Sequence, residues 1–264
     1  SQLYVCPMIR LVDVHKAFGP KRVLNGFTLD VNEGETTVII GYSGSGKSVA
    51  IKHIVGLLEP DAGTVFVDGQ EVPTLSRREL YLLRSKIGYV FQFAALFDSL
   101  TIGENVAMGL RKQSALTAAE IERRIDEALD LVDLPNVQDR FPAELSGGMR
   151  KRVGIARAIA LRPKYILYDE PTTGLDPVTS AVIDQLMIRM RDTLGVTSVV
   201  ITHDMRSAYT VGTRIAMLYE GRVRQVGSVD EIRHTTDPLV RQFIEGRATL
   251  DVGSQEVVGG AIAG

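Results

Sequence analysis

Cysteine is nearly missing from this 264-residue sequence, which contains one, Cys6. A single cysteine excludes a framework of internal disulfides and fits a reducing compartment. Long apolar runs are missing too, since no charge-free stretch reaches the roughly 18 residues that span a bilayer. Ser1–Met8 also lacks the basic segment and apolar stretch of a signal peptide. The sequence therefore predicts a soluble, cytosolic chain that needs another subunit to hold it at a membrane.

An excess of one charge is likewise missing. The chain has 30 basic and 32 acidic residues, a formal net charge of −2. A general nucleic-acid coat needs a clustered basic excess, so nucleic acid is not an expected partner. Hydrophobic residues make up 45% of the sequence. A chain of this length can therefore bury a substantial core, as one large domain or as a core with a smaller subdomain.

Short apolar segments alternate with longer helical patterns, which predicts an α/β fold with a mostly parallel sheet. Residues Thr37 to Ile40 are β-branched and apolar apart from the first side chain, as in a strand buried on both faces. The expected strands are Ile9–Val14, Thr36–Ile40, Thr64–Val67, Lys86–Phe91, Tyr165–Tyr168 and Ser198–Thr202.

The middle of the chain, from about residue 93 to 161, has few strand signals and several helical ones. Thr117 and Glu120 form a capping-box pair, and apolar residues then recur at helical spacing. This segment is expected to be an inserted helical subdomain. A later helix should begin with Asp176 as N-cap and Pro177 at its first position, and Gly195 suits its end.

Beyond Gly212 the pattern predicts a hairpin, formed by Arg214–Leu218 and Arg222–Val226, and then a capping box at Ser228–Glu231. Residues 246–264 form a glycine-rich C-terminal tail, for which both docking on a partner and disorder remain open.

The stretch Gly41-Tyr42-Ser43-Gly44-Ser45-Gly46-Lys47-Ser48 matches a phosphate-binding P-loop: glycine, any four residues, then Gly-Lys-Ser. Glycines let backbone N–H groups point at phosphate oxygens, and the helix that follows favours an anion at its N-terminus. We expect Lys47 to reach the β- and γ-phosphates of a nucleoside triphosphate and Ser48 to bind Mg²⁺. A chance glycine-rich turn is the alternative, but the strand before and the helix after argue against it.

Four further features follow the P-loop along the chain. Leu145-Ser146-Gly147-Gly148-Met149 opens a helical pattern, and the apolar strand Ile166–Tyr168 ends in Asp169 and Glu170. One of these carboxylates can hold a metal through water, and the other can orient an attacking water. His203 stands just past another apolar strand, and Gln92 just past an earlier one. Each is unremarkable alone, since a Ser-Gly-Gly turn or a strand-end histidine is usually structural.

Taken together and in their order along the chain, these features resemble the ATP-binding cassette (ABC) family over about Met8 to Gly246. The resemblance implies a P-loop NTPase fold with a mostly parallel core sheet, an N-terminal antiparallel β portion and the inserted helical subdomain, making one ATPase domain over residues 8–245. It also implies an ATPase with ATP and Mg²⁺ as cofactors. The motifs map onto residues as Walker A (Gly41–Ser48), Q-loop (Gln92), signature (Leu145–Met149), Walker B (Tyr165–Glu170), D-loop (Gly174–Asp176) and switch histidine (His203).

Roles follow from the same resemblance. Glu170 is the expected general base, His203 holds the γ-phosphate and the water, and Gln92 senses the metal that Ser48 and Asp169 help to bind. Val49 and the whole Walker A loop would contact the nucleotide. Phe18 stands where an aromatic residue stacks on adenine, although a core phenylalanine would look the same.

The family pairs two cassettes head to tail, so Ser146, Gly147, Gly148 and Asp176 would contact the nucleotide of the partner in a homodimer. Met149 departs from the glutamine common in the family. Because backbone amides and Ser146 make the phosphate contact, activity should survive this departure.

Val49, the Ser-Gly-Gly-Met signature and Phe91–Val106 look most similar to cassettes of MCE-type (Mla) lipid transporters. This likeness implies phospholipid transport at the cytoplasmic face of the bacterial inner membrane. The implied partners are an integral-membrane permease, an MCE-domain protein and a small STAS-domain protein. Side chains of Phe91–Val106 would line a groove for a permease helix, or equally pack inside the helical subdomain.

Two alternatives remain. An ATPase of another importer or exporter, for amino acids or drugs, would share every catalytic residue. A soluble cassette protein of translation or DNA repair would lack a permease, but such proteins usually carry two cassettes or long coiled coils, and neither feature is present.

Overall fold

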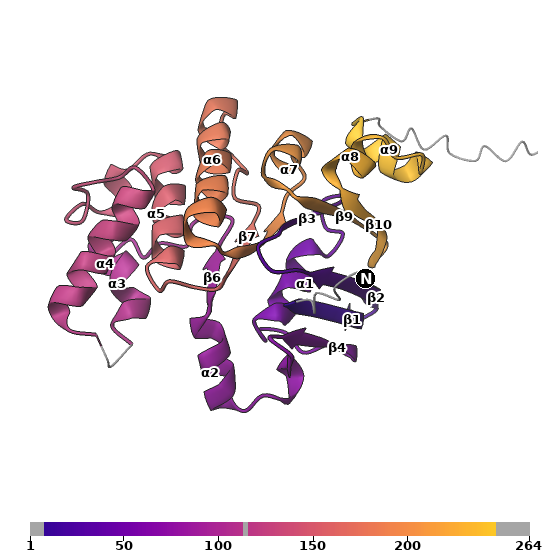
Figure 1. The fold of residues 1–264 in the computed structure, drawn as a ribbon, viewed down its shortest axis with the longest axis horizontal. Helices are drawn as coiled ribbons and strands as arrows, with labels where there is room; N and C mark the ends of the chain where they lie inside the picture. Colours follow the sequence, from indigo (N-terminus) through magenta and orange to yellow (C-terminus); the bar gives the residue numbers. More distant parts are fainter. Residues whose placement is uncertain (1–7, 113–115, 247–264) are drawn as a thin grey trace, which may run out of the picture.

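The computed structural model describes residues 8–112 and 116–246. Two sheets form its centre (Figure 1). The first has the order β2-β1-β4-β5 and is antiparallel, and the second has the order β10-β9-β3-β8-β7-β6. The strands are β1 (Ile9–Phe18), β2 (Lys21–Val31), β3 (Thr36–Ile40), β4 (Ala62–Val67), β5 (Gln70–Glu71), β6 (Ile87–Val90), β7 (Tyr165–Asp169), β8 (Thr197–Ile201), β9 (Arg214–Tyr219) and β10 (Arg222–Ser228).

The larger sheet is parallel from β9 to β6, and only β10 at its edge runs antiparallel. Its central strands β3, β7 and β8 are buried at every position, as expected for a parallel sheet covered on both faces. Alternate residues of β3 separate the two cores: Val38 and Ile40 join one cluster, and Ile39 joins the other. This confirms the predicted α/β fold, the mostly parallel sheet and the antiparallel N-terminal portion.

Helices complete the layers. They are α1 (Lys47–Ile54), α2 (Arg77–Ser85), α3 (Ile102–Leu110), α4 (Ala118–Leu131), α5 (Gly147–Ile159), α6 (Pro177–Leu194), α7 (Met205–Val211), α8 (Val229–Arg233) and α9 (Pro238–Ile244), with 3₁₀ turns at Val72–Thr74 and Pro142–Glu144. Helix α1 shares a core with the antiparallel sheet, and α3 to α7 share the core on the other face. Helices α3 to α5 gather at one end of the molecule, and α8 and α9 lie at the other (Figure 1).

Several caps stand where the sequence predicts them. Thr117 and Ser228 begin α4 and α8 with complete capping boxes, and Asp176 caps α6 with Pro177 at its first position. Gly195 ends α6 in the left-handed conformation, at φ 63°. Residues 93–112 and 116–161 hold α3, α4 and α5 and no strand, which confirms the helical character predicted for this segment.

Several elements were not predicted. No strand was expected at Lys21–Val31 or Gln70–Glu71, which form β2 and β5. No helix was expected at Arg77–Ser85, Met205–Val211 or Pro238–Ile244, which form α2, α7 and α9. The expectations about Cys6, the signal peptide and the C-terminal tail concern residues 1–7 and 247–264, which lie outside the described ranges.

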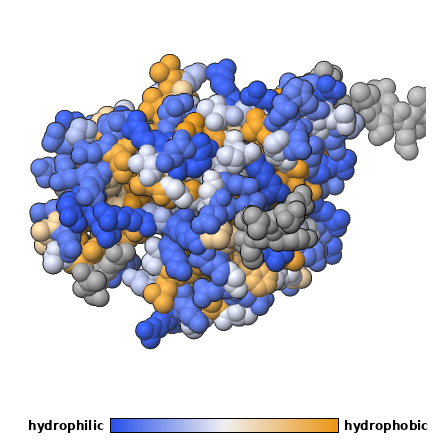
Figure 2. Space-filling model, viewed as in Figure 1, coloured by the Kyte–Doolittle hydropathy of each residue, from blue (hydrophilic) through white to orange (hydrophobic). Residues whose placement is uncertain are grey.

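The face seen in Figure 2 is mostly hydrophilic, with hydrophobic residues in small separate groups. None of the helices in residues 8–112 and 116–246 has the length and apolar character that a bilayer span requires.

Candidate nucleotide site

The predicted P-loop joins β3 to α1, at the carboxyl end of a central parallel strand, where open α/β sheets bind ligands. Gly41 begins the loop at a point where only glycine fits, because a Cβ there would lie 2.5 Å from the backbone oxygen of Leu218. Helix α1 then begins at Lys47, so its N-terminal N–H groups and its dipole face the loop. The hydroxyl of Ser45 is buried in this loop without a partner. An unpaired buried donor beside free N–H groups suits an anionic ligand.

Lys47 is 6% exposed, and its ammonium group supports the loop from inside. Its Nζ donates hydrogen bonds to the carbonyl oxygens of Gly41, at 2.9 Å, and Tyr42, at 3.1 Å. It also lies 3.7 Å from Oε1 of Glu170. Burial lowers the pKa of Lys47, and the nearby carboxylates of Glu170 and Asp169 oppose that shift.

Ser48 and Asp169 meet beside the loop as a pair of oxygen ligands. The hydroxyl of Ser48 donates to Oδ1 of Asp169 at 2.7 Å, and the hydroxyl of Tyr89 donates to Oδ2 at 3.1 Å. Asp169 is only 8% exposed. A hydroxyl and a carboxylate are the ligand types that Mg²⁺ uses with a bound triphosphate, so these residues fit the metal. Tyr89 is not recognisable from the sequence, because a strand tyrosine gives no separate signal.

Glu170 follows Asp169 with a backbone φ of 51°, a left-handed conformation that is strained for a residue with a Cβ. Its N–H donates to the carbonyl of Ile201, which fixes this turn at the end of β7. Oε2 of Glu170 accepts hydrogen bonds from Thr173, at 3.1 Å, and pairs with Nδ1 of His203 at 2.8 Å. The structure therefore places a carboxylate between a lysine and a histidine, as a base for water would need.

One cavity of about 480 Å³ joins these groups. It is lined by Phe18, Lys21, Val23, Ser43, Gly44, Gly46, Lys47, Ser48, Val49, Gln92, Glu170 and His203. Phe18 is 48% exposed and lines the cavity, so part of its side chain is open to a ligand, unlike a core phenylalanine. Lys21 and Val23 were not predicted. Lys21 pairs with Phe18 across the β1–β2 hairpin, and recognising β2 would have revealed it.

The chain beside Gln92 is held by two cations of α5. Lys151 donates to the backbone oxygen of Gln92, and Arg157 donates to the backbone oxygens of Ala94, at 2.6 Å, and Ala95, at 2.7 Å. Ala94 and Ala95 both have left-handed φ values, of 60° and 47°. The segment is thus tied to the helix that begins with the predicted signature.

The structure does not bring the signature residues into this cavity, since none of Ser146, Gly147, Gly148 and Asp176 lines it. Ser146 caps α5, with its hydroxyl accepting from the N–H of Met149 at 3.2 Å. Gly148 packs tightly against α6, and a Cβ there would lie 2.4 Å from Cγ2 of Thr179. Thr179 donates to Asp176, so the two predicted partner-facing segments are joined to each other within the chain.

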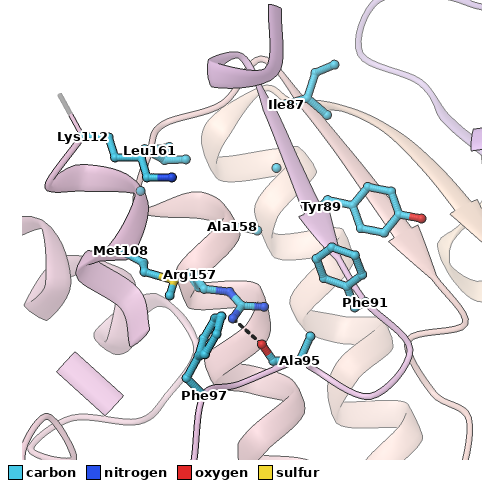
Figure 3. A pocket seen from close by; sticks show the side chains of 12 residues that line it. Ile87, Tyr89, Phe91, Ala95, Phe97, Met108, Lys112, Arg157, Ala158 and Leu161 are labelled. Carbon is cyan, nitrogen blue, oxygen red and sulfur yellow. Dashed lines mark hydrogen bonds between the residues drawn. The ribbon is translucent and has the colours of Figure 1, made fainter. Parts of the chain in front are cut away.

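A second, largely apolar cavity of about 430 Å³ opens next to the Gln92 segment (Figure 3). Its lining includes Phe91, Phe97, Met108 and Leu161. Arg157 also lines it, and burial lowers the pKa of its guanidinium. Within residues 8–112 and 116–246, this guanidinium bonds only to carbonyl oxygens and has no carboxylate partner.

Comparison with known proteins identifies the family. The family model described as ABC transporter matches residues 24–173. The probable ribonucleotide transport ATP-binding protein mkl of Mycobacterium leprae is 39% identical over 248 residues, which cover 94% of this chain and 72% of that protein. Protein trigalactosyldiacylglycerol 3 of Arabidopsis thaliana chloroplasts is 39% identical over 256 residues, covering 90% of this chain and 74% of that protein.

Other transport functions occur among the relatives. The methionine import ATP-binding protein MetN of Carboxydothermus hydrogenoformans is 42% identical over 224 residues, covering 84% of this chain and 66% of that protein. A dimeric ATP-binding cassette in a post-hydrolysis state, solved with ADP and phosphate, superposes with a TM-score of 0.77 at 37% identity. The match covers 84% of this chain and 99% of that structure.

The P-loop, the oxygen atoms of Ser48 and Asp169, and the carboxylate of Glu170 between Lys47 and His203 agree with these similarities in sequence and fold. Cassettes of this family bind ATP with Mg²⁺, form dimers and pair with membrane permease subunits. The chain belongs to the ABC transporter family and is its ATP-binding, ATP-hydrolysing subunit.

Proposed function

We propose that this ATPase drives the movement of phospholipid or a related lipid through an MCE-type membrane complex at the cytoplasmic face of the bacterial inner membrane. The observation that carries the proposal is the 39% identity, over 90% of the chain, to a protein named for trigalactosyldiacylglycerol, which is a lipid. The sequences around Val49 and Met149 and the segment Phe91–Val106 support the same proposal. A permease, an MCE-domain protein and a small STAS-domain protein are the partners in this proposal.

In the nucleotide site, the P-loop amides and Lys47 bind the β- and γ-phosphates, and Phe18 stacks on adenine. Ser48, Asp169 and Gln92 are the side chains that would hold Mg²⁺, directly or through water. The bound metal would neutralise charge on the phosphates. Glu170 takes a proton from the attacking water, and its contact with His203 keeps the carboxylate oriented.

The catalytic site is completed by a second copy of the chain. Ser146, Gly147, Gly148 and Asp176 lie outside the cavity lined by Lys47, Ser48, Glu170 and His203, so they are available to the partner's ATP. The N-terminus of α5 adds backbone N–H groups and a favourable dipole for the γ-phosphate. Because Thr179 joins Gly148 to Asp176, the signature and the D-loop would approach the partner as one rigid unit.

Replacing Ser146 with arginine tests this arrangement. The variant is expected to lose hydrolysis while the isolated monomer still binds Mg-ATP, because the new side chain obstructs only the site shared with a partner. Titration of a fluorescent ATP analogue and a phosphate-release assay measure the two properties. Ser85→Arg, at the end of α2, is a control that adds the same side chain elsewhere. Loss of monomer binding in Ser146→Arg would place Ser146 in its own chain's site and refute the head-to-tail model.

The apolar cavity beside Gln92 is the proposed seat of a cytoplasmic helix of the permease. Its exposed aromatic side chains Phe91 and Phe97 offer apolar contact. The guanidinium of Arg157, which bonds carbonyl oxygens and no carboxylate among the described residues, would pair with a carboxylate on the incoming helix. Arg157 also holds the carbonyls of Ala94 and Ala95. Movement of the docked helix would therefore be passed from Arg157 to Ala94, which is only two residues from Gln92.

Purification of the tagged chain from its native membrane, with identification of partners and bound lipids, tests the function. The permease, an MCE-domain protein and phospholipid are expected to co-purify. Phe97→Glu should release the permease, because the new carboxylate would pair with Arg157 and repel the carboxylate proposed on the permease helix. Val226→Glu on β10, another exposed apolar site at the edge of the larger sheet, should leave the complex intact.

An amino-acid importer is the second candidate, favoured by the 42% identity to a methionine import protein. The same purification separates the two candidates. Recovery of an amino-acid or drug permease in place of an MCE-domain protein would refute the lipid proposal and leave the ATPase assignment unchanged. Recovery without any permease would instead favour a soluble role.

A further inference from the structure

The second residue of the P-loop makes an aromatic contact with the C-terminal helix. The ring of Tyr42 lies with its centroid 5.0 Å from that of Phe243 in α9, at an interplanar angle of 81°. Tyr219, at the end of β9, lies 6.4 Å from Tyr42 at 65°. Both are edge-to-face arrangements, which aromatic pairs favour. The ring of Tyr42 does not line the nucleotide cavity. Phe243 lies beyond residues 24–173, the part matched by the family model.

The backbone carbonyl of Tyr42 is bonded within the loop. Its carbonyl oxygen accepts hydrogen bonds from Nζ of Lys47 and from the N–H of Ser45, both at 3.1 Å. One residue therefore links the aromatic contact outside the loop to the lysine inside it. The neighbouring residue, Gly41, is seated against the carbonyl of Leu218 on the strand that carries Tyr219.

Helix α9 is a fixed support for this contact. Asp237 caps it by accepting from the N–H groups of Leu239 and Val240, and pairs with Arg224 of β10 at 2.8 Å. Val240 is fully buried in the core. The capped and buried part of the helix therefore carries the partly buried ring of Phe243 beside Tyr42.

We infer that Phe243 is a positioning residue for nucleotide binding. Through the ring of Tyr42 it holds the start of the P-loop in the conformation in which Lys47 and the loop amides meet the phosphates, so α9 sets the affinity of the cassette for Mg-ATP. A loop held in place before binding loses less freedom when the ligand arrives. The inference rests on the proposed role of the P-loop as the phosphate cradle.

Phe243→Ala tests this role. The Kd and KM for Mg-ATP are expected to rise about three- to tenfold, the range that one aromatic pair contributes. The kcat at saturating ATP should stay within about twofold, because the groups that act on the γ-phosphate are unchanged. Phe243→Tyr should restore the parent affinity. Leu239→Ala is the matched control, since it removes a partly buried apolar side chain from the same helix and leaves the Tyr42–Phe243 ring pair in place.

A double variant separates positioning from general stability. In a Tyr42→Ala background, adding Phe243→Ala should change the Kd for Mg-ATP no further, although it still lowers the melting temperature. Independent, multiplying effects of the two substitutions would overturn the inference, and so would an equal loss of affinity in Leu239→Ala. Lys47→Ala distinguishes failure of the P-loop assignment from failure of the role of Phe243. Unchanged binding in Lys47→Ala would refute the phosphate cradle itself, whereas the outcomes above refute only the part played by Phe243.

Discussion

Replacing Glu170 with glutamine is expected to slow ATP hydrolysis by about two to four orders of magnitude, the contribution typical of general-base catalysis, while Mg-ATP binding persists. Glutamine keeps the shape of the side chain and can accept from Thr173 and His203 at the same positions. It cannot take a proton from water. The left-handed backbone at Glu170 and its N–H bond to Ile201 do not depend on the carboxylate, so the turn should keep its form.

Because chemistry stops and binding does not, Glu170→Gln should also accumulate as an ATP-bound dimer. Gel filtration with and without Mg-ATP measures this shift, and single-turnover phosphate release measures the chemistry. Glu122→Gln, an exposed position on α4, applies the same change away from the site and should behave like the parent chain. Near-normal turnover in Glu170→Gln would remove Glu170 from the role of base, and a variant that binds ATP but stays monomeric would contradict the sandwich dimer.

Sequence alone predicted the elements whose signals are local. The buried strands β3, β7 and β8 each contain an unbroken apolar run of three or four residues. The caps at Thr117, Asp176 and Ser228 have their partners two or three residues away. The spacing Gly-Lys-Ser after β3 likewise predicts where phosphate groups bind. Such features depend on neighbours in the chain, so a single sequence is enough to find them.

What escaped prediction depends on distant contacts. Strand β2 mixes exposed and buried residues over 11 positions and contains Gly26, so its period is broken by bulges in its pairing with β1. Lys151 supports the oxygen of Gln92 across 59 residues, and Tyr89 meets Asp169 across 80. No short pattern encodes these pairs, and only the order of strands in the sheet brings them together.

The expected result for Lys47→Ala is loss of hydrolysis by at least about two to three orders of magnitude, the cost of removing one main electrostatic contact to a reacting group. Binding of Mg-ATP should also weaken strongly, by about 10- to 100-fold for one charge-assisted hydrogen bond. Two causes add. The first is electrostatic: the phosphates lose their buried cation, and the carboxylates of Glu170 and Asp169 then face the negative triphosphate without it.

The second cause lies in the loop. Nζ of Lys47 supports the carbonyls of Gly41 and Tyr42, so alanine also removes the internal bonds that hold the loop in shape. Isothermal titration with Mg-ATP and a phosphate-release assay measure binding and turnover together. Lys52→Ala, in the last turn of the same helix, deletes an equal charge outside the cavity and should leave both unchanged. Turnover near the parent rate in Lys47→Ala would refute the P-loop assignment, because no other lysine or arginine among the described residues both lies buried in the loop and lines the cavity.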